Sequence, residues 1–370
     1  MTVPTTKSLQ NKPKVLFLGQ LDESLPEYQQ FENDFECIPY ELTTKEQLLE
    51  DFKSKFNDIQ AIYGGWEGFM SFGGYRNEIV DLSPPNLKIV TSCAVGFDHY
   101  DTIQLKNKKI IFSNSPSVGA EQVADLALYQ TLSTFRFIPM FANQTVSTKN
   151  TLVARSKLNG NFNYQSGNHV PKNHYNFAFG EIAGGKVVYT PMNKNAAILG
   201  FGGIGKALAK RLNAIGMNIH YFKRNPLSND DLSDFNFPLT YHNSLTSILP
   251  IADVVIICLP GSSETFNLIN EKTINLLPKR GSRIVNVGRG FIVNTKDLLN
   301  GLKSGKIISC ALDVFENEPT IDQELVSRED VFLTPHIGSS TIETYQKTAI
   351  FCLNNIRACF ERKPILSQQN

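Results

Sequence analysis

Three side chains that can together handle a carboxylate and a proton lie in the C-terminal half of the chain. They are Arg289, Glu318 and His336, and each follows a separate apolar stretch that is typical of a buried strand. In an open α/β sheet, ligands bind beyond the carboxyl ends of the strands, so we expect the three side chains to meet. Arginine can hold a carboxylate through two hydrogen bonds, histidine can move a proton near neutral pH, and a neighbouring carboxylate orients its ring. This set suits the reduction of a 2-oxo acid by hydride from a nicotinamide.

A glycine-rich turn earlier in the chain indicates where a nicotinamide cofactor would bind. An apolar run at 196–199 leads into glycines with GxGxxG spacing, and residues 206–212 continue with helical spacing of apolar residues. In such a corner the glycines permit a tight turn, let the pyrophosphate approach the backbone and let the helix pack on the strand. The helix N-terminus then offers free N–H groups and a positive dipole end to the phosphates. The cofactor-binding residues predicted here are Gly200, Gly202, Gly203, Ile204 and Gly205.

The second predicted strand of this unit ends in two cations rather than in the carboxylate expected of an NAD site. NAD-binding units usually place Asp or Glu there to hold the ribose hydroxyls, whereas this chain has Lys223 followed by Arg224. Two cations suit the 2′-phosphate of NADP. The sequence therefore predicts NADP(H) as the preferred cofactor. The alternative is NAD(H), with both cations acting only as solvated surface residues.

Composition narrows the class of protein. The chain has 370 residues and a formal net charge of +1, which gives no reason to invoke nucleic acid or an anionic membrane as a partner. Its six cysteines form no CxxC pair and several lie in apolar runs, so we expect reduced thiols in a cytoplasmic protein. No apolar stretch approaches membrane-spanning length, and residues 1–14 lack the apolar core of a signal peptide. No metal site is predicted.

Alternating strand and helix patterns predict an α/β fold with two Rossmann-like domains, each a parallel sheet flanked by helices. Long helix patterns at 118–136 and 341–360 mark the two crossings between the domains, and the Asn- and Gly-rich stretch 141–195 predicts surface loops and short elements. We expect a nucleotide-binding domain inserted in a flavodoxin-like substrate-binding domain. The predicted boundaries are 118–337 for the nucleotide-binding domain, and 1–117 with 338–370 for the substrate-binding domain.

Several motifs of the chain resemble those of the D-isomer-specific 2-hydroxyacid dehydrogenases, over about residues 87–364. They are the stretch 95–98 with Asp101, the glycine turn, and the stretches 258–260, 285–290, 311–319 and 334–338. Within the family, the chain is most similar to the fungal D-mandelate dehydrogenase-like and glyoxylate/hydroxypyruvate reductase group. The segments 96–98, 125–129 and 342–344 carry that finer match. By this resemblance a homodimer is also expected.

The resemblance implies roles for individual residues. Arg289 matches the arginine that binds the substrate carboxylate and carbonyl, Glu318 the glutamate that supports the catalytic histidine, and His336 that histidine, the acid and base. A loop whose backbone N–H groups bind the substrate carboxylate matches Val95 and Gly96. Further cofactor contacts are implied at Leu259, Pro260, Val287 and Asp313, the last of these near the nicotinamide amide.

Three further residues have two interpretations each. Trp66, the only tryptophan, follows a predicted strand end, so that it and Phe69 either wall the substrate pocket or pack in the core. His99 follows the loop motif at 95–98 and lies within reach of a substrate there, or is an ordinary loop histidine.

Two classes of function fit the scaffold. The first is reduction of a 2-oxo acid, either glyoxylate or hydroxypyruvate, or a bulkier aromatic acid such as benzoylformate. The second is nucleotide sensing by a corepressor-like binding protein. Those proteins carry long C-terminal tails, whereas this chain continues for only ten residues after Phe360, which favours the enzyme. A formate dehydrogenase-like function needs an amide beside the histidine, and Glu318 argues against it.

Overall fold

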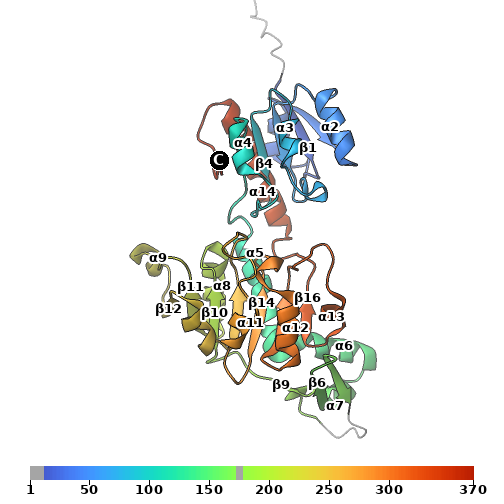
Figure 1. Ribbon diagram of the computed structural model, residues 1–370, viewed down its shortest axis with the longest axis vertical. Coiled ribbons are helices and arrows are strands. Elements are labelled where there is room, and N and C mark those ends of the chain that lie inside the picture. The colour runs from blue at the N-terminus through green and yellow to red at the C-terminus, as the bar shows by residue number, and fades with distance from the viewer. Residues whose placement is uncertain (1–11, 172–177) are drawn as a thin grey trace, which may run out of the picture. The chain divides into compact units, whose positions relative to one another are not determined.

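The structure is a computed structural model that describes residues 12–171 and 178–370. The chain divides into two compact units (Figure 1). One unit comprises the chain up to Gly119 together with Ser340–Asn370, and the other comprises Ala120–Ser339. We describe the two units separately and refer to them as the split unit and the central unit.

The split unit contains a five-stranded sheet in the order β2-β1-β3-β4-β5, and all its strand pairs are parallel. This is the flavodoxin-like order, and it matches the predicted fold class. The strands are β1 (Lys14–Leu18), β2 (Glu36–Tyr40), β3 (Ala61–Gly64), β4 (Ile89–Ser92) and β5 (Ile111–Ser113). The helices are α1 (Pro26–Glu32), α2 (Lys45–Lys53), α3 (Glu78–Asp81), α4 (Thr102–Asn107) and α14 (Ile342–Phe360), with a 3₁₀ turn at Met70–Phe72.

The side chains of β1 pack alternately in two separate cores, because successive residues of a strand point to opposite faces of the sheet. Leu16 and Leu18 pack with residues of α2, α3 and α4, whereas Val15 and Phe17 pack with residues of α1 and α14. Helix α14 comes from the far end of the chain and closes the second face. Its first turn is capped by Thr341, whose hydroxyl accepts a hydrogen bond from the Thr344 N–H.

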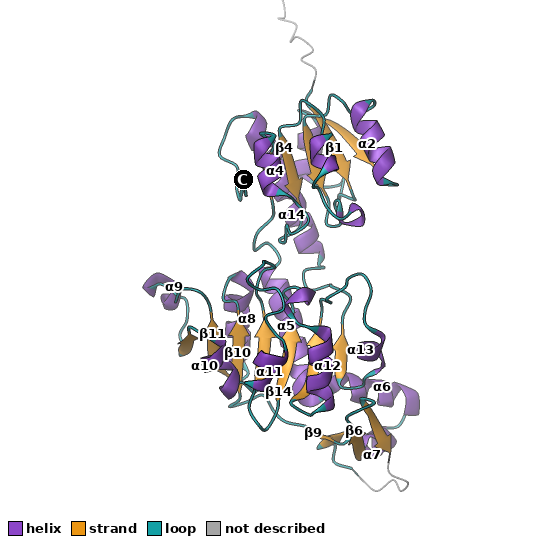
Figure 2. Ribbon diagram, in the orientation of Figure 1, coloured by secondary structure: helices purple, strands orange, loops and turns teal. Residues whose placement is uncertain are grey.

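The central unit contains a seven-stranded sheet in the order β12-β11-β10-β13-β14-β15-β16, again with every strand pair parallel (Figure 2). Its strands are β10 (Asn195–Leu199), β11 (Asn218–Phe222), β12 (Leu239–His242), β13 (Val254–Ile257), β14 (Ser282–Asn286), β15 (Ile307–Leu312) and β16 (Val331–Leu333). The strand order reverses on either side of β10, as in dinucleotide-binding folds, and ligands bind at such a switch point.

Helices cover both faces of this sheet. Residues of α5 (Ala120–Arg136) and α8 (Gly203–Ala214) pack on one face, where they join Ala196 and Ile198 of β10 in one core. Ala197 and Leu199 point to the other core, which is closed by α10 (Leu245–Ile248), α11 (Glu271–Asn275), α12 (Thr295–Lys303) and α13 (Gln323–Ser327). Outside the segment between α5 and β10, the other described elements of this unit are α9 (Asn229–Ser233) and the 3₁₀ turns Leu249–Ile251 and Gly290–Ile292. The α/β class with helix-covered parallel sheets is thus confirmed.

The segment between α5 and β10, which we call the excursion, holds more regular structure than its sequence predicts. It contains helices α6 (Ile138–Thr148) and α7 (Thr151–Leu158), the antiparallel pair β6 (Gly160–Asn163) and β7 (Asn168–Pro171), and the short pair β8 (Ile182–Ala183) and β9 (Lys186–Val187). The expectation of loops and short elements is wrong for α6. Pro139 follows the end of α5 and lies in the first turn of α6, where the missing N–H of proline is tolerated.

A buried ionic cluster attaches the excursion to the sheet. The Lys186 ammonium group lies 2.8 Å from Oδ2 of Asp330, and Arg328 donates to both oxygens of the same carboxylate at 2.9 and 3.0 Å. All three side chains are 2% exposed or less. Burial lowers the pKa of Lys186, and the attraction of Asp330 opposes that shift. This cluster lies where β16 begins.

Candidate active site

Strands β14, β15 and β16 are neighbours in the sheet, and each leads into one of the three predicted catalytic residues. Arg289 follows β14, Glu318 follows β15 and His336 follows β16. Because the strands are parallel, all three residues leave the sheet at its carboxyl edge. The alternation that was visible in the sequence therefore places the three side chains on one edge of the central unit.

The backbone around Arg289 is held by close approaches on both sides. A Cβ atom at Gly288 would lie 2.6 Å from the carbonyl oxygen of Leu259, and one at Gly290 would lie 1.9 Å from the Phe315 carbonyl. Only glycine permits both contacts. The Asn286 side-chain amide donates to the Arg289 carbonyl at 3.0 Å, and the Arg289 guanidinium donates to the Gly288 carbonyl at 2.9 Å. Arg289 is thereby fixed between the ends of β13 and β15.

Glu318 and His336 form a direct pair. His336 Nδ1 lies 2.9 Å from Glu318 Oε2, and the two side chains are 31% and 28% exposed. Oε1 of Glu318 accepts a second hydrogen bond, from the Phe315 N–H at 2.8 Å. Burial acts to raise the pKa of Glu318, but the hydrogen bonds from His336 and Phe315 and the nearby charge of Arg289 outweigh it and lower that pKa below its usual value. The carboxylate therefore stays ionised around neutral pH, as a partner for an imidazolium must.

Asp313 lies beneath the loop that carries His336. Its side chain is 2% exposed, and its carboxylate accepts hydrogen bonds from the Thr334 hydroxyl and from the N–H groups of Ile337 and Gly338. The sequence did not indicate these contacts. The nicotinamide contact that the resemblance implies for Asp313 is a separate expectation.

The glycine turn has the shape that a dinucleotide pyrophosphate requires. Gly200 has a positive φ of 92°, and a Cβ there would lie 2.8 Å from backbone atoms of Cys258 and Leu259. A Cβ at Gly205 would lie 2.3 Å from the Gly200 carbonyl oxygen, whereas one at Gly202 would meet no atom within 4 Å. Helix α8 starts here without a side-chain cap. The open space at Gly202 and the uncapped N–H groups, which include those of Gly203 and Ile204, fit a bound phosphate.

Lys223 and Arg224 directly follow β11, the strand beside β10. The Arg224 guanidinium lies 3.5 Å from the carboxylate of Glu264, and these side chains are 81% and 68% exposed. Sequence reasoning did not identify Glu264, which lies in the loop after β13. Leu259 and Pro260 open that same loop, and Val287 lies directly after β14.

The predicted substrate-loop residues belong to the split unit. Val95 and Gly96 follow β4, and Trp66 follows β3. The side chains of Val95 and Trp66 are 45% and 46% exposed. Phe69 is 1% exposed and its ring centroid lies 4.4 Å from that of Tyr75, so Phe69 is a core residue.

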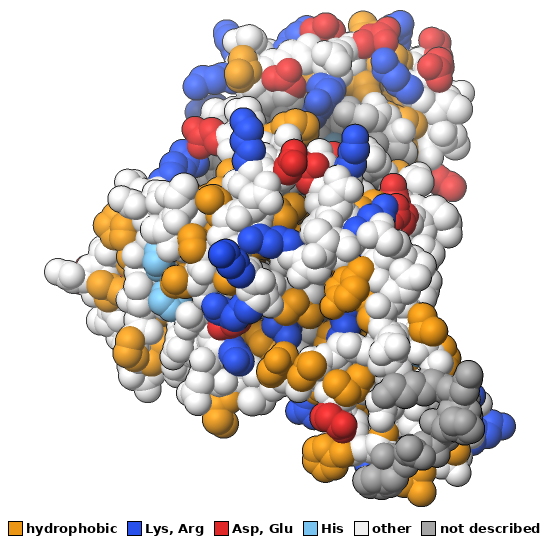
Figure 3. Space-filling model, turned by 60° about the horizontal axis from the view of Figure 1, so that its bottom comes forward, with side chains coloured by type: hydrophobic (Ala, Val, Ile, Leu, Met, Phe, Trp, Pro, Cys, Tyr) orange, Lys and Arg blue, Asp and Glu red, His pale blue; other side chains and the backbone are white. Residues whose placement is uncertain are grey.

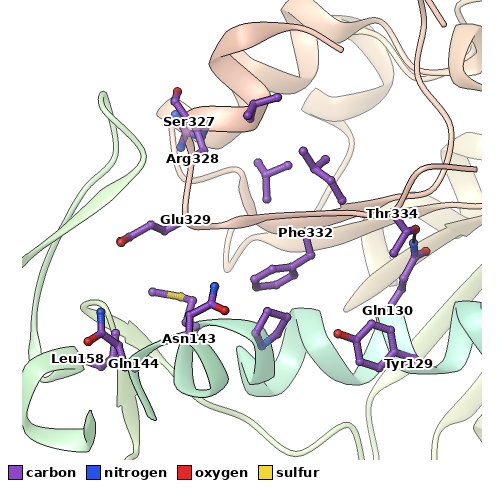
Figure 4. Close-up of a pocket in the computed structure, with 15 residues that line it drawn as sticks. Tyr129, Gln130, Asn143, Gln144, Leu158, Ser327, Arg328, Glu329, Phe332 and Thr334 are labelled. Atoms are coloured by element: carbon purple, nitrogen blue, oxygen red, sulfur yellow. Dashed lines mark hydrogen bonds between the residues drawn. The ribbon is translucent and has the colours of Figure 1, made fainter. Parts of the chain in front are cut away.

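A cavity of about 410 Å³ is lined by residues of α5, α6 and β16 and of the segment that precedes β16 (Figure 4). Gln130 of α5 and Thr334, which follows β16, form one wall of the cavity. Arg328 and Glu329, which precede β16, lie at its other end. The cavity contains none of the three predicted catalytic residues, and we do not assign it to the reaction.

The described residues give two further findings. No group of three or more His, Cys, Asp or Glu side chains among them is arranged to hold a metal ion. In the same part of the chain, no helix combines the length and the apolar character that crossing a membrane requires.

Comparisons with known proteins agree with this geometry. Residues 169–338 match the family model described as "D-isomer specific 2-hydroxyacid dehydrogenase, NAD binding domain". The chain is 31% identical to a glyoxylate reductase of Pyrococcus furiosus over 360 residues, which cover 96% of this chain and 94% of that protein.

Two solved structures are similar over nearly the whole chain. The holo form of D-mandelate dehydrogenase from Rhodotorula graminis has a TM-score of 0.84 and 28% identity, with 97% of this chain and 98% of that chain covered. An NADPH-dependent glyoxylate/hydroxypyruvate reductase from Sinorhizobium meliloti, solved in complex with NADP and malonate, has a TM-score of 0.73 and 25% identity, with 97% of each chain covered.

Proposed function

We propose that this chain, which belongs to the D-isomer-specific 2-hydroxyacid dehydrogenase family as its motifs predict, reduces a 2-oxo acid to a D-2-hydroxy acid with NADPH. The observation that carries this proposal is the pairing of Glu318 with His336 at 2.9 Å, on the strand edge that also carries Arg289. Arginine, histidine and carboxylate at one edge are the groups that such a reduction needs.

Each of the three side chains has a defined task. Arg289 binds the substrate carboxylate and polarises the carbonyl that is reduced. His336 holds its Nδ1 against Glu318, so Nε2 is the nitrogen that delivers a proton to the carbonyl oxygen. NADPH, when bound, would supply the hydride for the carbonyl carbon. Glu318 orients the imidazole ring and, as a carboxylate, favours its protonated form before the proton is transferred.

The preference for NADPH is supported by Lys223 and Arg224 at the end of β11. The 2′-phosphate would replace Glu264 as the partner of Arg224, whose contact at 3.5 Å is largely exposed. The similar Sinorhizobium enzyme is named as NADPH-dependent and was solved with NADP. We expect kcat/KM with NADPH to exceed that with NADH by at least about tenfold, since a phosphate–arginine contact is charge-assisted.

Arg224→Ala tests this cofactor assignment. We expect it to remove most of the preference for NADPH while leaving kcat/KM with NADH within about twofold. Glu264→Gln, which removes a competing carboxylate, is expected to raise the preference. Equal use of both cofactors by the unmodified protein would show that the two cations do not contact the 2′-phosphate.

For the substrate we propose either glyoxylate and hydroxypyruvate, or an aromatic 2-oxo acid such as benzoylformate. Similar proteins are named for both classes, as glyoxylate reductase and as D-mandelate dehydrogenase. We assign cofactor binding to residues 118–337 and substrate binding to residues 1–117 with 338–370. Val95, Gly96 and Trp66 are then the candidate substrate contacts on the split unit.

Initial rates with NADPH across glyoxylate, hydroxypyruvate, pyruvate, phenylpyruvate and benzoylformate test the function. We expect one class to be preferred and the product to be the D isomer. Tight binding of NADPH without turnover of any of these acids would instead favour the corepressor-like function.

We also propose a cytoplasmic homodimer. All six cysteines are free, as expected in a reducing compartment. The excursion exposes several large apolar side chains, and Figure 3 shows apolar side chains gathered toward the bottom of that view. The exposed apolar residues of the excursion include Val146, Val170 and Phe179, which are 76%, 50% and 78% exposed. Exposed apolar surface of this kind favours contact with a second copy, which sedimentation would test.

A further inference from the structure

The loop that presents His336 is short and conformationally strained. His336 itself has a φ of 54°, in the left-handed region that residues other than glycine rarely adopt. Its N–H donates back to the Thr334 carbonyl at 3.0 Å, which closes a tight turn around Pro335. Such a backbone persists only where the surrounding contacts hold it in place.

The Asp313 carboxylate supplies those contacts from below. Oδ1 accepts from the Ile337 N–H at 2.9 Å, and Oδ2 accepts from the Gly338 N–H at 2.8 Å. Both donors directly follow His336 in the chain. The third donor is the Thr334 hydroxyl, at 2.6 Å from Oδ1, so the carboxylate binds the loop on both sides of the histidine.

The Thr334 hydroxyl is held in turn by Gln130. A hydroxyl has one proton, and Thr334 donates it to Asp313, so the contact to Gln130 must run the other way. The Gln130 side-chain amide donates to Thr334 Oγ1 at 3.0 Å (Figure 4, dashed line). Gln130 is 1% exposed and lies on the rigid helix α5, and Asp313 is 2% exposed. Breaking these hydrogen bonds is costly because it leaves a polar group of a buried residue without its partner.

We propose that Gln130 and Thr334 are positioning residues for the reaction, which act through Asp313 on the His336 loop. We call the hydrogen bonds from Gln130 to Thr334 and from Thr334 to Asp313 the relay. The relay holds the Asp313 carboxylate in place, and the carboxylate holds the left-handed turn. This turn places the His336 imidazole against Glu318. The inference rests on the proposed function for its kinetic consequence, but the relay concerns the His336–Glu318 contact itself.

Thr334→Val tests the relay because it removes the hydroxyl and keeps the shape of the side chain. The loop then loses one of its three hydrogen bonds to Asp313, the one that precedes His336 in the chain. Displacements of about 1 Å at a reacting group cost on the order of 100-fold, so we expect kcat to fall about 10- to 100-fold. We expect the KM for the 2-oxo acid and the Kd for NADPH to change less than threefold. The pH above which reduction slows should move down, because the imidazolium loses contact with Glu318.

Matched variants separate positioning from simple stability. Thr334→Ser keeps the hydroxyl and should restore kcat to within about threefold of the unmodified enzyme. Thr131→Val removes a buried hydroxyl from α5, the helix that carries Gln130. That hydroxyl donates to the Ala127 carbonyl at 2.7 Å. Thr131→Val should lower the unfolding temperature as Thr334→Val does, but leave kcat and the pH profile unchanged. Gln130→Met should act like Thr334→Val, with a smaller loss.

A second readout does not depend on turnover. The imidazole signals of His336, followed at fixed pH by NMR of protein with labelled histidine, should change in Thr334→Val and not in Thr131→Val. Glu318→Gln combined with Thr334→Val should shift the pH profile no further than Glu318→Gln alone. An unchanged kcat, pH profile and His336 NMR signal in a folded Thr334→Val protein would overturn the relay. Absence of turnover in the unmodified protein, with the NMR response intact, would overturn only the proposed function.

Discussion

Among the described residues of the central unit, two histidine–carboxylate pairs have nearly the same contact distance but different surroundings. His336 Nδ1 lies 2.9 Å from Glu318, and His169 Nδ1 lies 2.7 Å from Glu329. The first pair lies at the carboxyl edge of the sheet beside Arg289. The second lies at the opposite end of β16, where Glu329 also accepts from the His169 N–H at 2.8 Å.

The difference between the pairs lies in what else their groups hold. Glu329 binds the backbone and the ring of His169, and the N–H of Glu329 donates to the Gly167 carbonyl, so this pair fastens the excursion to β16. Next to it lies the fully buried cluster around Asp330. The Glu318 pair is half-buried and sits on a strained turn. A histidine–carboxylate distance alone therefore does not identify a catalytic site; the strand edge and the neighbouring arginine do.

The largest expected effect separates the two histidines. His336→Gln should lower kcat about 100- to 10,000-fold, because it removes proton donation to the carbonyl. NADPH binding, measured by fluorescence titration, should be unchanged. His169→Gln is the matched control and should leave kcat within about twofold. Comparable losses in both variants would show that the two pairs do not differ in function.

Asp330→Asn tests the structural side of the comparison. It leaves the buried cations Lys186 and Arg328 without their carboxylate, so we expect the free energy of unfolding to fall by about 3–5 kcal/mol. Denaturant titration measures this, and kcat of the folded protein should stay within about threefold. Glu324→Gln removes a carboxylate that is 39% exposed and should cost less than about 1 kcal/mol. A small change in the free energy of unfolding of Asp330→Asn would contradict the view that this cluster holds the excursion on the sheet.

Arg289→Lys should have an intermediate effect. Lysine keeps the charge but loses the planar pair of donors that fits a carboxylate, so we expect kcat/KM to fall about 10- to 100-fold through both KM and kcat. Arg280→Lys is the control, since Arg280 pairs with Asp253 at the start of β13. Kinetics of Arg289→Lys close to those of the unmodified enzyme would assign Arg289 a structural role.

The smallest expected effect is a shift in pH dependence. The pKa of Glu318 is lowered by His336, so the attraction between them is present above the ordinary pKa of a glutamate and is lost as the pH falls through the lowered value. Glu318→Gln removes it at neutral pH, so the pH above which reduction slows should move down. Glu329→Gln should leave this profile in place. An unshifted profile in Glu318→Gln would contradict the proposed role of the carboxylate.

The sequence by itself determined the features that depend on local pattern. Buried parallel strands appear as short apolar runs, and their carboxyl ends lie at one edge, so Arg289, Glu318 and His336 could be grouped without a structure. The turn at Gly200–Gly205 was equally visible, because its GxGxxG spacing lies within six residues, and the backbone geometry requires glycine at Gly200 and Gly205. Each strand with the residues that follow it, and the whole glycine turn, could be recognised from residues that lie close together in the chain.

Only the tertiary structure decided the features that join distant segments. Gln130 and Thr334 are 204 residues apart in the chain, and nothing in the periodicity of either segment predicts their hydrogen bond. The same holds for Glu264 beside Arg224, and for the burial of Phe69. The physical reason is that hydrophobic periodicity determines which face of an element is buried, whereas a polar contact between elements depends on the register in which they pack. That register exists only in the folded chain.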